Sequence, residues 1–226
     1  MIGYTLLFYT CVKETSEKSV ILLAEHYYSE KPSSKSNPTT LETTLRGNRM
    51  IFTTDDGVFS KSEIDFGTKL LIESFIFPEE EGTILDVGCG YGPIGLSLAK
   101  DNERRNVMLV DINERALSLA EKNRYANKIE NATILKSNLF QQVPTDQYAA
   151  ILSNPPIRAG KKVVYQLFRD AFDFLKENGE LWIVIQKKQG APSAKKELES
   201  LFGFVEIVDK AKGYMIFRSK KVDPSV

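Results

Sequence analysis

The segment Ile84–Gly95 is the part of this sequence that most constrains how the chain can fold. A short apolar run leads into glycines at positions 88, 90 and 92, and a helical pattern starts directly after them. Glycine lacks a Cβ atom, so a backbone rich in it can turn tightly and approach a ligand closely. A buried strand, a glycine turn and a helix in direct succession are typical of Rossmann-like nucleotide sites, including those for NAD.

Strand and helix patterns alternate from residue 83 onward. Strands are expected at Thr83–Val87, Val107–Val110, Ala132–Leu135, Tyr148–Leu152 and Glu180–Ile185. Helices are expected at Ile94–Lys100, Asn113–Ala126, Lys161–Glu177 (stopped by Gly179) and Ala194–Leu201. Alternation of this kind implies a parallel sheet that is covered by helices on both faces.

The last two strand patterns, Phe204–Val208 and Tyr214–Phe217, lie close together in the sequence and predict an antiparallel hairpin. We therefore expect a doubly wound, Rossmann-like α/β fold with a seven-stranded, mostly parallel sheet that ends in this hairpin. Trp182 lies in an apolar strand, and we assign its side chain to the core.

The chain has 226 residues, enough for one α/β domain with a short appendage. We place that domain at residues 81–222 and a lead-in at residues 25–80. Residues 1–24 form an extension of a different composition. Either it is a genuine extra element, or translation has been assigned from too early a start; we favour the second, with the start at Val20, Leu22 or Leu23.

The lead-in carries signals for an exposed stretch, a hairpin and a helix. Residues 29–45 are rich in Ser, Thr, Lys and Pro, which indicates an exposed segment. Asp56-Gly57 predicts a tight turn between two strand-like runs, Arg46–Phe52 and Val58-Phe59. Ser60 or Ser62 can cap the helix that follows.

Composition excludes several classes of protein. Thirty basic and thirty acidic residues give a formal net charge of zero, which argues against strong nonspecific binding to nucleic acid. Cys11, Cys89 and His26 stand in no metal-ligand spacing, and two distant cysteines fit a reducing cytosol. No apolar run reaches the roughly 18 residues of a transmembrane helix. We expect no metal, no membrane partner and a cytoplasmic location.

Polar residues follow the expected strands where a nucleotide would bind. Asp111 ends the second strand, nineteen residues after Gly92, and an acidic residue there can accept both ribose hydroxyls of an adenosine. Asn138 follows the third strand, and its amide could meet the adenine edge. Simple capping or turn roles for these two residues are the alternatives.

Asn154-Pro155-Pro156-Ile157 follows the fourth strand and distinguishes between nucleotide chemistries. The prolines fix the backbone and lack N–H donors. The side-chain oxygen of Asn154 and the carbonyl of Pro155 can therefore act as two acceptors for one –NH2 group. Two acceptors aim the amine's lone pair at a methyl donor, and a sulfonium methyl requires positioning more than a strong base. A dehydrogenase has no use for this arrangement, and a merely rigid turn is the alternative.

These motifs, in this order and spacing, resemble those of class I S-adenosylmethionine-dependent methyltransferases: Asp86–Gly92, Asp111 and Asn154–Ile157. Three further segments are similar to the ribosomal RNA small-subunit methyltransferase C family: Ser153–Lys161, Asp56–Ser60 and Asp65-Phe66-Gly67. The resemblance covers about residues 25–220. It implies methylation of the exocyclic N2 of a guanine, with ribosomal RNA or the small ribosomal subunit as partner.

The resemblance also implies roles for individual residues. It assigns S-adenosylmethionine binding to Asp86, Gly88, Gly90, Gly92, Asp111, Asn138 and Phe59, and catalysis to Asn154, Pro155 and Pro156. We expect substrate binding by Ile157, Arg158, Lys161, Lys187 and Lys188, with Lys162 beside them; ordinary solvated charges are the alternative for the four lysines. These cations follow the fourth and fifth strands, at the edge where open α/β sheets bind ligands.

The sequence departs from the family's pattern at three points. The best-known members carry two such domains, the first inert, and this chain has a single catalytic one. The adenine position is Asn138, where an acidic residue is common. Ile157 replaces an aromatic residue that could stack on a flipped base, so Phe59 or Arg158 would have to take that part.

Three other functions remain open from the sequence. The same chemistry could act on a protein glutamine or on adenine N6. A catalytically silent RNA-binding assembly factor could use the same scaffold. A dinucleotide-dependent oxidoreductase is a third possibility, against which Asn154-Pro155-Pro156 argues.

Overall fold

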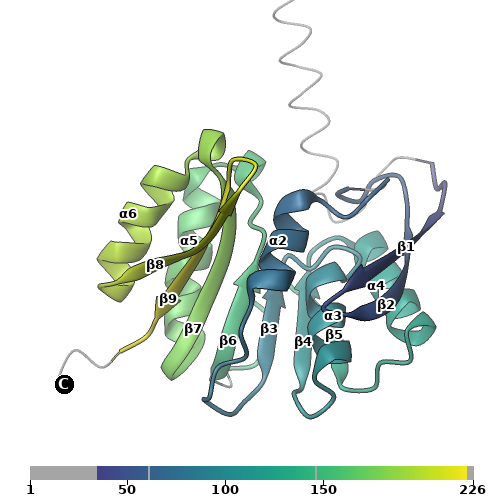
Figure 1. The fold of residues 1–226 in the computed structure, drawn as a ribbon, viewed down its shortest axis with the longest axis horizontal. Coiled ribbons are helices and arrows are strands. Elements are labelled where there is room, and N and C mark those ends of the chain that lie inside the picture. The colour runs from purple at the N-terminus through teal and green to yellow at the C-terminus, as the bar shows by residue number, and fades with distance from the viewer. Residues whose placement is uncertain (1–34, 61, 146, 223–226) are drawn as a thin grey trace, which may run out of the picture.

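The computed structural model describes residues 35–60, 62–145 and 147–222. A seven-stranded sheet runs through its centre in the order β5-β4-β3-β6-β7-β9-β8 (Figure 1). Its parallel strands are β3 (Ile84–Val87), β4 (Val107–Asp111), β5 (Ala132–Lys136), β6 (Tyr148–Ser153) and β7 (Leu175–Gln186). The antiparallel pair β8 (Val205–Ala211) and β9 (Tyr214–Lys220) completes the sheet. The expected α/β fold is confirmed; the proposed extension 1–24 and His26 lie outside the described residues.

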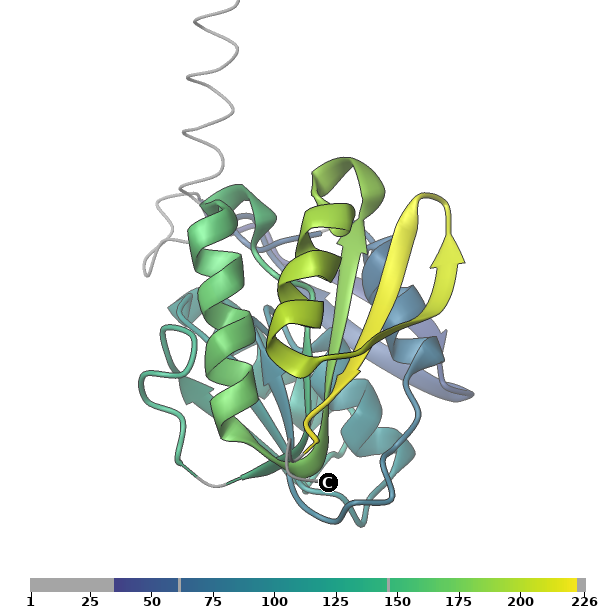
Figure 2. The ribbon, with the colours of Figure 1, turned by 90° about the vertical axis from the view of Figure 1, so that its left-hand side faces the viewer.

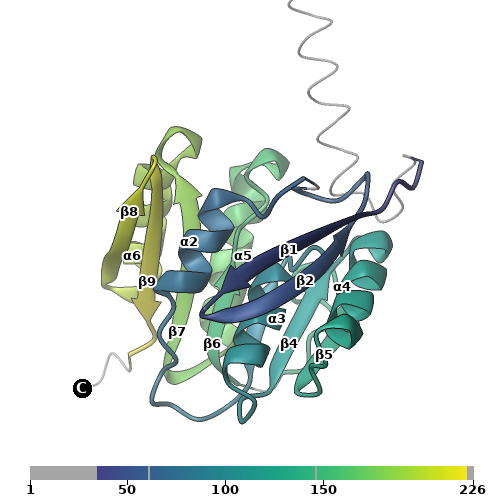
Figure 3. The ribbon, with the colours of Figure 1, turned by 45° about the vertical axis from the view of Figure 1, so that its right-hand side comes forward.

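Helices cover both faces of the sheet. On one face lie α2 (Phe66–Ser74), α3 (Pro93–Asp101) and α4 (Glu114–Ala126), together with the hairpin of β1 (Thr39–Leu45) and β2 (Asn48–Thr54) (Figure 3). On the other lie α5 (Lys161–Phe174) and α6 (Ala191–Phe202) (Figure 2). Two short 3-10 turns, η1 (Ile157–Ala159) and η2 (Lys187–Gln189), follow β6 and β7.

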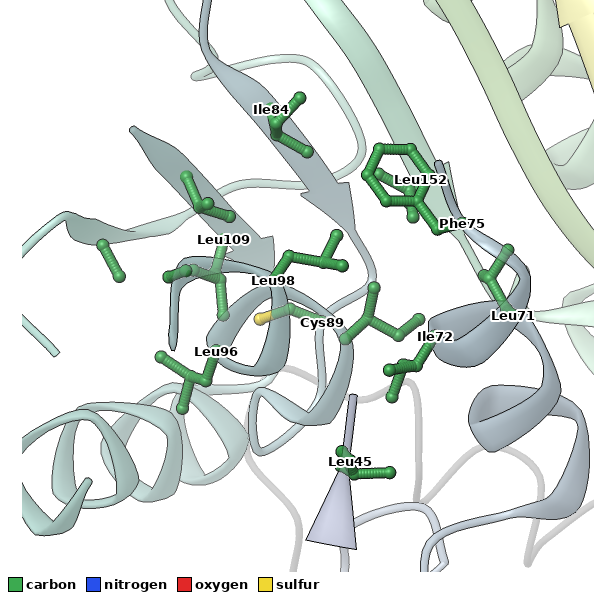
Figure 4. Packing of buried hydrophobic residues seen from close by; sticks show 14 of the residues in the cluster. Leu45, Leu71, Ile72, Phe75, Ile84, Cys89, Leu96, Leu98, Leu109 and Leu152 are labelled. Carbon is green, nitrogen blue, oxygen red and sulfur yellow. The ribbon is translucent and has the colours of Figure 1, made fainter. Parts of the chain in front are cut away.

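Two apolar clusters hold these layers together, because successive side chains of a strand point to opposite faces. In β3, Ile84 packs under α2 and α3, whereas Leu85 and Val87 pack on the α5 face. Figure 4 shows the first cluster, with Cys89 among its apolar side chains. Trp182 is fully buried there and meets Phe75 edge to face at 5.2 Å between ring centroids. Its assignment to the core is confirmed.

The prediction of a hairpin turn at Asp56-Gly57 is wrong. The hairpin joins β1 to β2 through Arg46-Gly47, whose φ angles of 49° and 75° are both positive. Positive φ at both turn residues matches the right-handed twist of paired strands, which is why such turns connect hairpins. Residues 39–45, expected to be an exposed lead-in, supply its first strand, and Asp56-Gly57 lies in the loop that follows its second.

Two helix boundaries also differ from expectation. Asp65, not Ser60 or Ser62, caps α2, because its carboxylate accepts the N–H of Thr68. Helix α5 ends at Phe174, and β7 begins at once with Leu175. Gly179 lies in β7 where the pairing with β6 shifts register; a Cβ atom there would come within 2.9 Å of a backbone carbonyl oxygen. Gly179 therefore permits a close approach of two backbone segments, and it does not end a helix.

Candidate active site

A cavity of about 490 Å³ opens at the carboxyl ends of the central parallel strands. The chain runs outward from β3 on both sides, so the crevice lies where the strand order reverses and open α/β sheets bind ligands. Ten of the residues predicted from the sequence line it: Phe59, Gly88, Gly90, Asp111, Asn138, Asn154, Pro155, Pro156, Ile157 and Arg158. The volume is typical of small-molecule sites.

The glycine turn forms one wall of this cavity. Gly88 and Gly90 have φ angles of 75° and 58°, and a Cβ atom on either would meet nothing within 4 Å. The glycines therefore leave the backbone of the turn open toward a ligand. Gly92 does not line the cavity; its φ is 93°, and a Cβ atom there would lie 2.7 Å from the side chain of Leu96. The positive φ of Gly92 allows the glycine turn to lead directly into α3.

Asp111 is held rigidly beside the turn. One carboxylate oxygen accepts the N–H of Gly90 at 2.8 Å, and the other accepts the N–H of Asn113 at 2.9 Å. Burial raises the pKa of Asp111, although these backbone donors oppose that rise. A carboxylate oxygen can accept more than one hydrogen bond, so both can still receive ligand hydroxyls.

Asp86 lies beneath the cavity and does not line it. It is fully buried, and one oxygen accepts the N–H of Gly95 at 2.8 Å while the other has no partner among the described residues. Burial raises the pKa of Asp86 to about 7; the Gly95 N–H opposes this rise, and the charge of Asp111 adds to it. Asp86 therefore ties β3 to α3 under the site.

Phe59 and Asn138 stand on the wall of the cavity. Phe59 is 52% exposed, an unusual position for a large aromatic side chain. The loop that carries it is fixed on its two sides by hydrogen bonds from Asn113 to Gly57 and from Tyr91 to Ser60. Asn138 is exposed after β5, at the side of the cavity formed by Asp111. Both can reach a bound ligand.

Asn154 follows the last residue of β6. Its side-chain nitrogen donates to Thr68 Oγ1 at 2.9 Å and lies 3.5 Å from an oxygen of Asp65. A carboxylate only accepts hydrogen bonds, so this contact determines which end of the Asn154 amide is the NH2 group. Asn154 forms part of the cavity lining, and its Oδ1 has no hydrogen-bond partner among the described residues.

The backbone around Asn154 is fixed as well. Ser153 Oγ donates to the carbonyl of Val87 at 2.7 Å, which ties the end of β6 to the end of β3. The carbonyl of Pro155 accepts the N–H of Ile157 at 2.8 Å, in the tight turn that leads into η1. A carbonyl oxygen has two lone pairs, so one remains for a second donor.

Sequence reasoning missed Asp65, Thr68 and Tyr214 as lining residues. Asp65 and Thr68 come from the first turn of α2, and Tyr214 begins β9, 149 positions later. Tyr214 donates its hydroxyl to Asp65 at 3.1 Å. The segment around Asp65 contributed to the family resemblance, but no local pattern connects it with Tyr214.

The predicted cations differ in whether they line the cavity. Arg158 lines the cavity, whereas Lys161, Lys162, Lys187 and Lys188 are exposed and do not. Lys187 and Lys188 precede Gln189, which lines it, on η2. None of the five forms an ion pair with another residue in the described ranges, so their charges are available to an anionic partner.

Residues 35–60, 62–145 and 147–222 contain neither a candidate metal centre nor a helix that could cross a membrane. There, no three His, Cys, Asp or Glu side chains gather where a metal ion could be held. Every helix in the same ranges falls short of the length and hydrophobicity that a membrane crossing requires. Burial raises the pKa of Cys89 well above its usual value, which disfavours its reactive thiolate.

The sequence of this chain is similar to a known protein family and to several individual proteins. Residues 49–218 match the family described as methyltransferase small domain. The chain is 58% identical over 201 residues to the uncharacterized protein YbxB of Bacillus subtilis, covering 88% of this chain and 100% of that protein. It is 34% identical to ribosomal RNA small subunit methyltransferase C of Actinobacillus succinogenes, covering 71% of this chain and 48% of that enzyme. The chain thus spans about half the length of the methyltransferase C relatives.

A solved structure shares the fold. It is the T. thermophilus 16S rRNA N2 G1207 methyltransferase in complex with AdoMet and guanosine. It superposes with a TM-score of 0.73 at 24% identity and covers 84% of this chain and 52% of that one. Since the family match spans most of the domain and the sheet has the expected topology, the chain belongs to the methyltransferase small domain family, as a class I methyltransferase whose cofactor is S-adenosylmethionine.

Proposed function

We propose that this protein methylates the exocyclic N2 of a guanine in ribosomal RNA, with Asn154 and the Pro155 carbonyl as the groups that hold the target amine. The observation that carries the proposal is the orientation of Asn154. Its NH2 group contacts Thr68 and Asp65, which leaves the amide oxygen free to accept a hydrogen from a substrate in the cavity that Asn154 lines.

The residues of the cavity fit S-adenosylmethionine. The bare backbone of Gly88 and Gly90 gives room for a ligand to lie against the turn. Asp111 and Asn138 both line this cavity, which supports ribose hydroxyls as the ligands of the Asp111 carboxylate and the adenine edge as the partner of Asn138. When bound, this cofactor supplies an electrophilic methyl group on a positively charged sulfur. The chain therefore needs to position a nucleophile and exclude water, and does not need to generate a strong base.

An exocyclic amine has two hydrogens, and the site offers two acceptors for them. Asn154 Oδ1 and the second lone pair of the Pro155 carbonyl can each receive one N–H. Holding both hydrogens fixes the plane of the amine and directs its lone pair into the cavity. Acceptors of this kind also stabilise the positive charge that develops on the nitrogen as it is alkylated.

Ribosomal RNA as the substrate class is supported by the relatives and by the mouth of the cavity. The Actinobacillus succinogenes relative acts on ribosomal RNA according to its name, and the T. thermophilus enzyme was solved with guanosine. A base must leave its stack to enter such a cavity. Phe59, Ile157 and Arg158 line it and can contact the faces of a flipped base. A ribosomal substrate also accords with the expected cytoplasmic location.

Mass spectrometry of ribosomal RNA nucleosides, from cells with and without this protein, tests the proposal. We expect N2-methylguanosine at one position to disappear on deletion and to return when the parent gene, but not Asn154→Ala, is supplied. Loss of N6-methyladenosine, or of a methylated glutamine in protein, would move the substrate to another amine. Unchanged methylation with impaired ribosome assembly would support the silent RNA-binding alternative instead.

A further inference from the structure

The amide of Asn154 is attached to two side chains of α2 that have different hydrogen-bonding capacities. Thr68 Oγ1, at 2.9 Å, can both donate and accept, so it would tolerate either end of an amide. Asp65, at 3.5 Å, accepts only, and it therefore favours the end that carries NH2. Of the two contacts, only the one with Asp65 discriminates between the two orientations of the Asn154 side chain.

Asp65 itself is held from two directions. Its backbone and side chain cap α2, accepting the N–H groups of Lys69 at 3.0 Å and Thr68 at 3.2 Å. Its other oxygen accepts the hydroxyl of Tyr214 at 3.1 Å. Since helix α2 fixes the backbone and Tyr214 fixes the second oxygen, the carboxylate has little freedom to turn away from Asn154.

Tyr214 reaches this carboxylate because the chain makes room for its ring. A Cβ atom on Gly67 would lie 2.5 Å from two ring carbons of Tyr214, so the ring packs directly on the backbone of α2. The hairpin turn before it is bound to η2, directly after β7, because Lys187 donates its backbone N–H to the carbonyl of Gly213 at 2.7 Å. The C-terminal hairpin thus delivers one hydroxyl to a site built from the central strands.

We propose that Asp65 and Tyr214 are positioning residues, which hold the Asn154 amide with its oxygen toward the target amine. A reversed amide would present NH2 to an NH2 group, so the site would lose an acceptor and gain a repulsive donor. The inference rests on the proposed function, because it gives the oxygen of Asn154 an amine to receive. The β8–β9 hairpin thus contributes to the reaction through the hydroxyl of Tyr214, in addition to the glycine turn and Asn154.

Four substitutions separate orientation from folding. Asp65→Ser keeps a residue that caps helices about as well, but its short side chain has no carboxylate oxygen to offer Asn154 or Tyr214. Tyr214→Phe keeps the ring on Gly67 and removes the hydroxyl. Thr68→Val removes a hydroxyl at constant shape, and Thr68→Ser restores it.

Kinetics on ribosomal RNA give the first readout. Asp65→Ser should lower kcat by roughly 10- to 100-fold, the scale of a misplaced reacting group. Tyr214→Phe should lower it about fivefold, as expected for one hydrogen bond. Melting temperature, affinity for S-adenosylmethionine and KM for RNA should stay near the parent values. Tyr125→Phe, on the exposed outer face of α4, is the matched control and should leave kcat unchanged. Thr68→Ser should recover most of the activity that Thr68→Val loses.

NMR of the Asn154 side-chain NH2 group gives a readout that needs no activity. Its two proton signals, assigned by their loss in Asn154→Ala, should shift and exchange faster in Asp65→Ser and Thr68→Val, and change little in Tyr125→Phe. Unchanged signals, or kcat at the parent level in both Asp65→Ser and Tyr214→Phe, would overturn the inference. A parent protein that methylates no RNA would overturn the proposed function, whereas the NMR comparison would still decide whether the pair orients Asn154.

Discussion

Asn123 of α4 exchanges two hydrogen bonds with the backbone of Thr53 in β2. Thr53 donates its N–H to Oδ1 at 2.6 Å, and Nδ2 donates to the Thr53 carbonyl at 3.0 Å. Asn127, one helical turn later, does the same with Ile51 at 2.9 and 2.7 Å. Two asparagines therefore act as a neighbouring strand for the edge of β2 that β1 does not cover. This contact anchors the hairpin ahead of the loop that carries Phe59.

Removing the first of these side chains should cost stability. Asn123→Ala leaves the buried backbone groups of Thr53 unpaired, together with the Tyr91 carbonyl that Asn123 also serves. We expect the free energy of unfolding to fall by about 3 kcal/mol, from the penalty of buried unsatisfied groups. Urea denaturation measures it, with the exposed neighbour Lys122→Ala as control. Equal stability of the two variants would show that the asparagine is dispensable.

The buried Asp86 should make stability depend on pH. Its pKa is about 7 in the folded protein, raised by burial, against roughly 3.9 in an unfolded chain. The folded state therefore keeps a proton that the unfolded state loses, and the free energy of unfolding from this group falls as pH rises from about 4 to 7. The decrease is complete above the folded pKa and amounts to roughly 4 kcal/mol.

Asp86→Asn isolates this contribution, since the amide oxygen can still accept the Gly95 N–H. We expect the variant to gain stability relative to the parent as pH rises from 5 to 8, in denaturation without cofactor. Parallel stability curves for variant and parent across that interval would mean that Asp86 is ionised in the folded state at both pH values.

Asp111 should matter for the cofactor more than for the fold. Asp111→Asn preserves the size of the side chain and can still accept one of the backbone N–H groups it now receives. Removal of the charge should weaken S-adenosylmethionine binding by roughly 1–3 kcal/mol, the scale of charge-assisted hydrogen bonds. Calorimetry gives the affinity, and Asp173→Asn, exposed on α5, serves as control. If both variants bind like the parent, the ribose site has been misplaced.

The cations of η2 should attract RNA. Lys187→Glu with Lys188→Glu places repulsive charge beside the mouth of the cavity, and the salt slope falls by roughly 0.7–0.9 for every phosphate that a cation no longer neutralises. We expect weaker RNA binding with a flatter dependence on salt, and unchanged affinity for S-adenosylmethionine. The same reversal at Lys122 and Lys128, both exposed and outside the cavity lining, controls for net charge. Identical behaviour of the two pairs would make the mouth an ordinary solvated edge.

The parts of the fold that sequence predicted are those determined by local patterns. The glycine turn, the helix start at Asn113 and the strands that alternate with helices appear where expected, apart from the early start of β7 at Leu175. The hairpin was misplaced because Asp-Gly is a preferred dipeptide of hairpin turns, whereas Arg-Gly is not. What stabilises the true hairpin is Asn123, 70 positions after its partner in β2, and no local pattern records that contact.

The candidate site also combines residues that local sequence patterns reveal with residues that only distant contacts bring into place. Residues at the ends of strands, such as Asp111 at the end of β4 and Asn154 directly after β6, could be recognised from their position, and they line the cavity. Asp86 matched a motif but lies beneath the cavity, because alternation along β3 directs it under α3. Tyr214 could not be found from sequence, since it reaches Asp65 only after β9 inserts between β7 and β8.

Methyl transfer by Asn154→Ala tests the central claim most directly. Radiolabelled S-adenosylmethionine and ribosomal RNA are incubated with the parent, with Asn154→Ala and with Asn106→Ala, an exposed asparagine outside the cavity. We predict that all three bind S-adenosylmethionine alike, that parent and control label N2 of one guanine, and that turnover of Asn154→Ala falls by roughly 10²-fold or more. Turnover of Asn154→Ala near the parent rate would contradict the assigned role of Asn154.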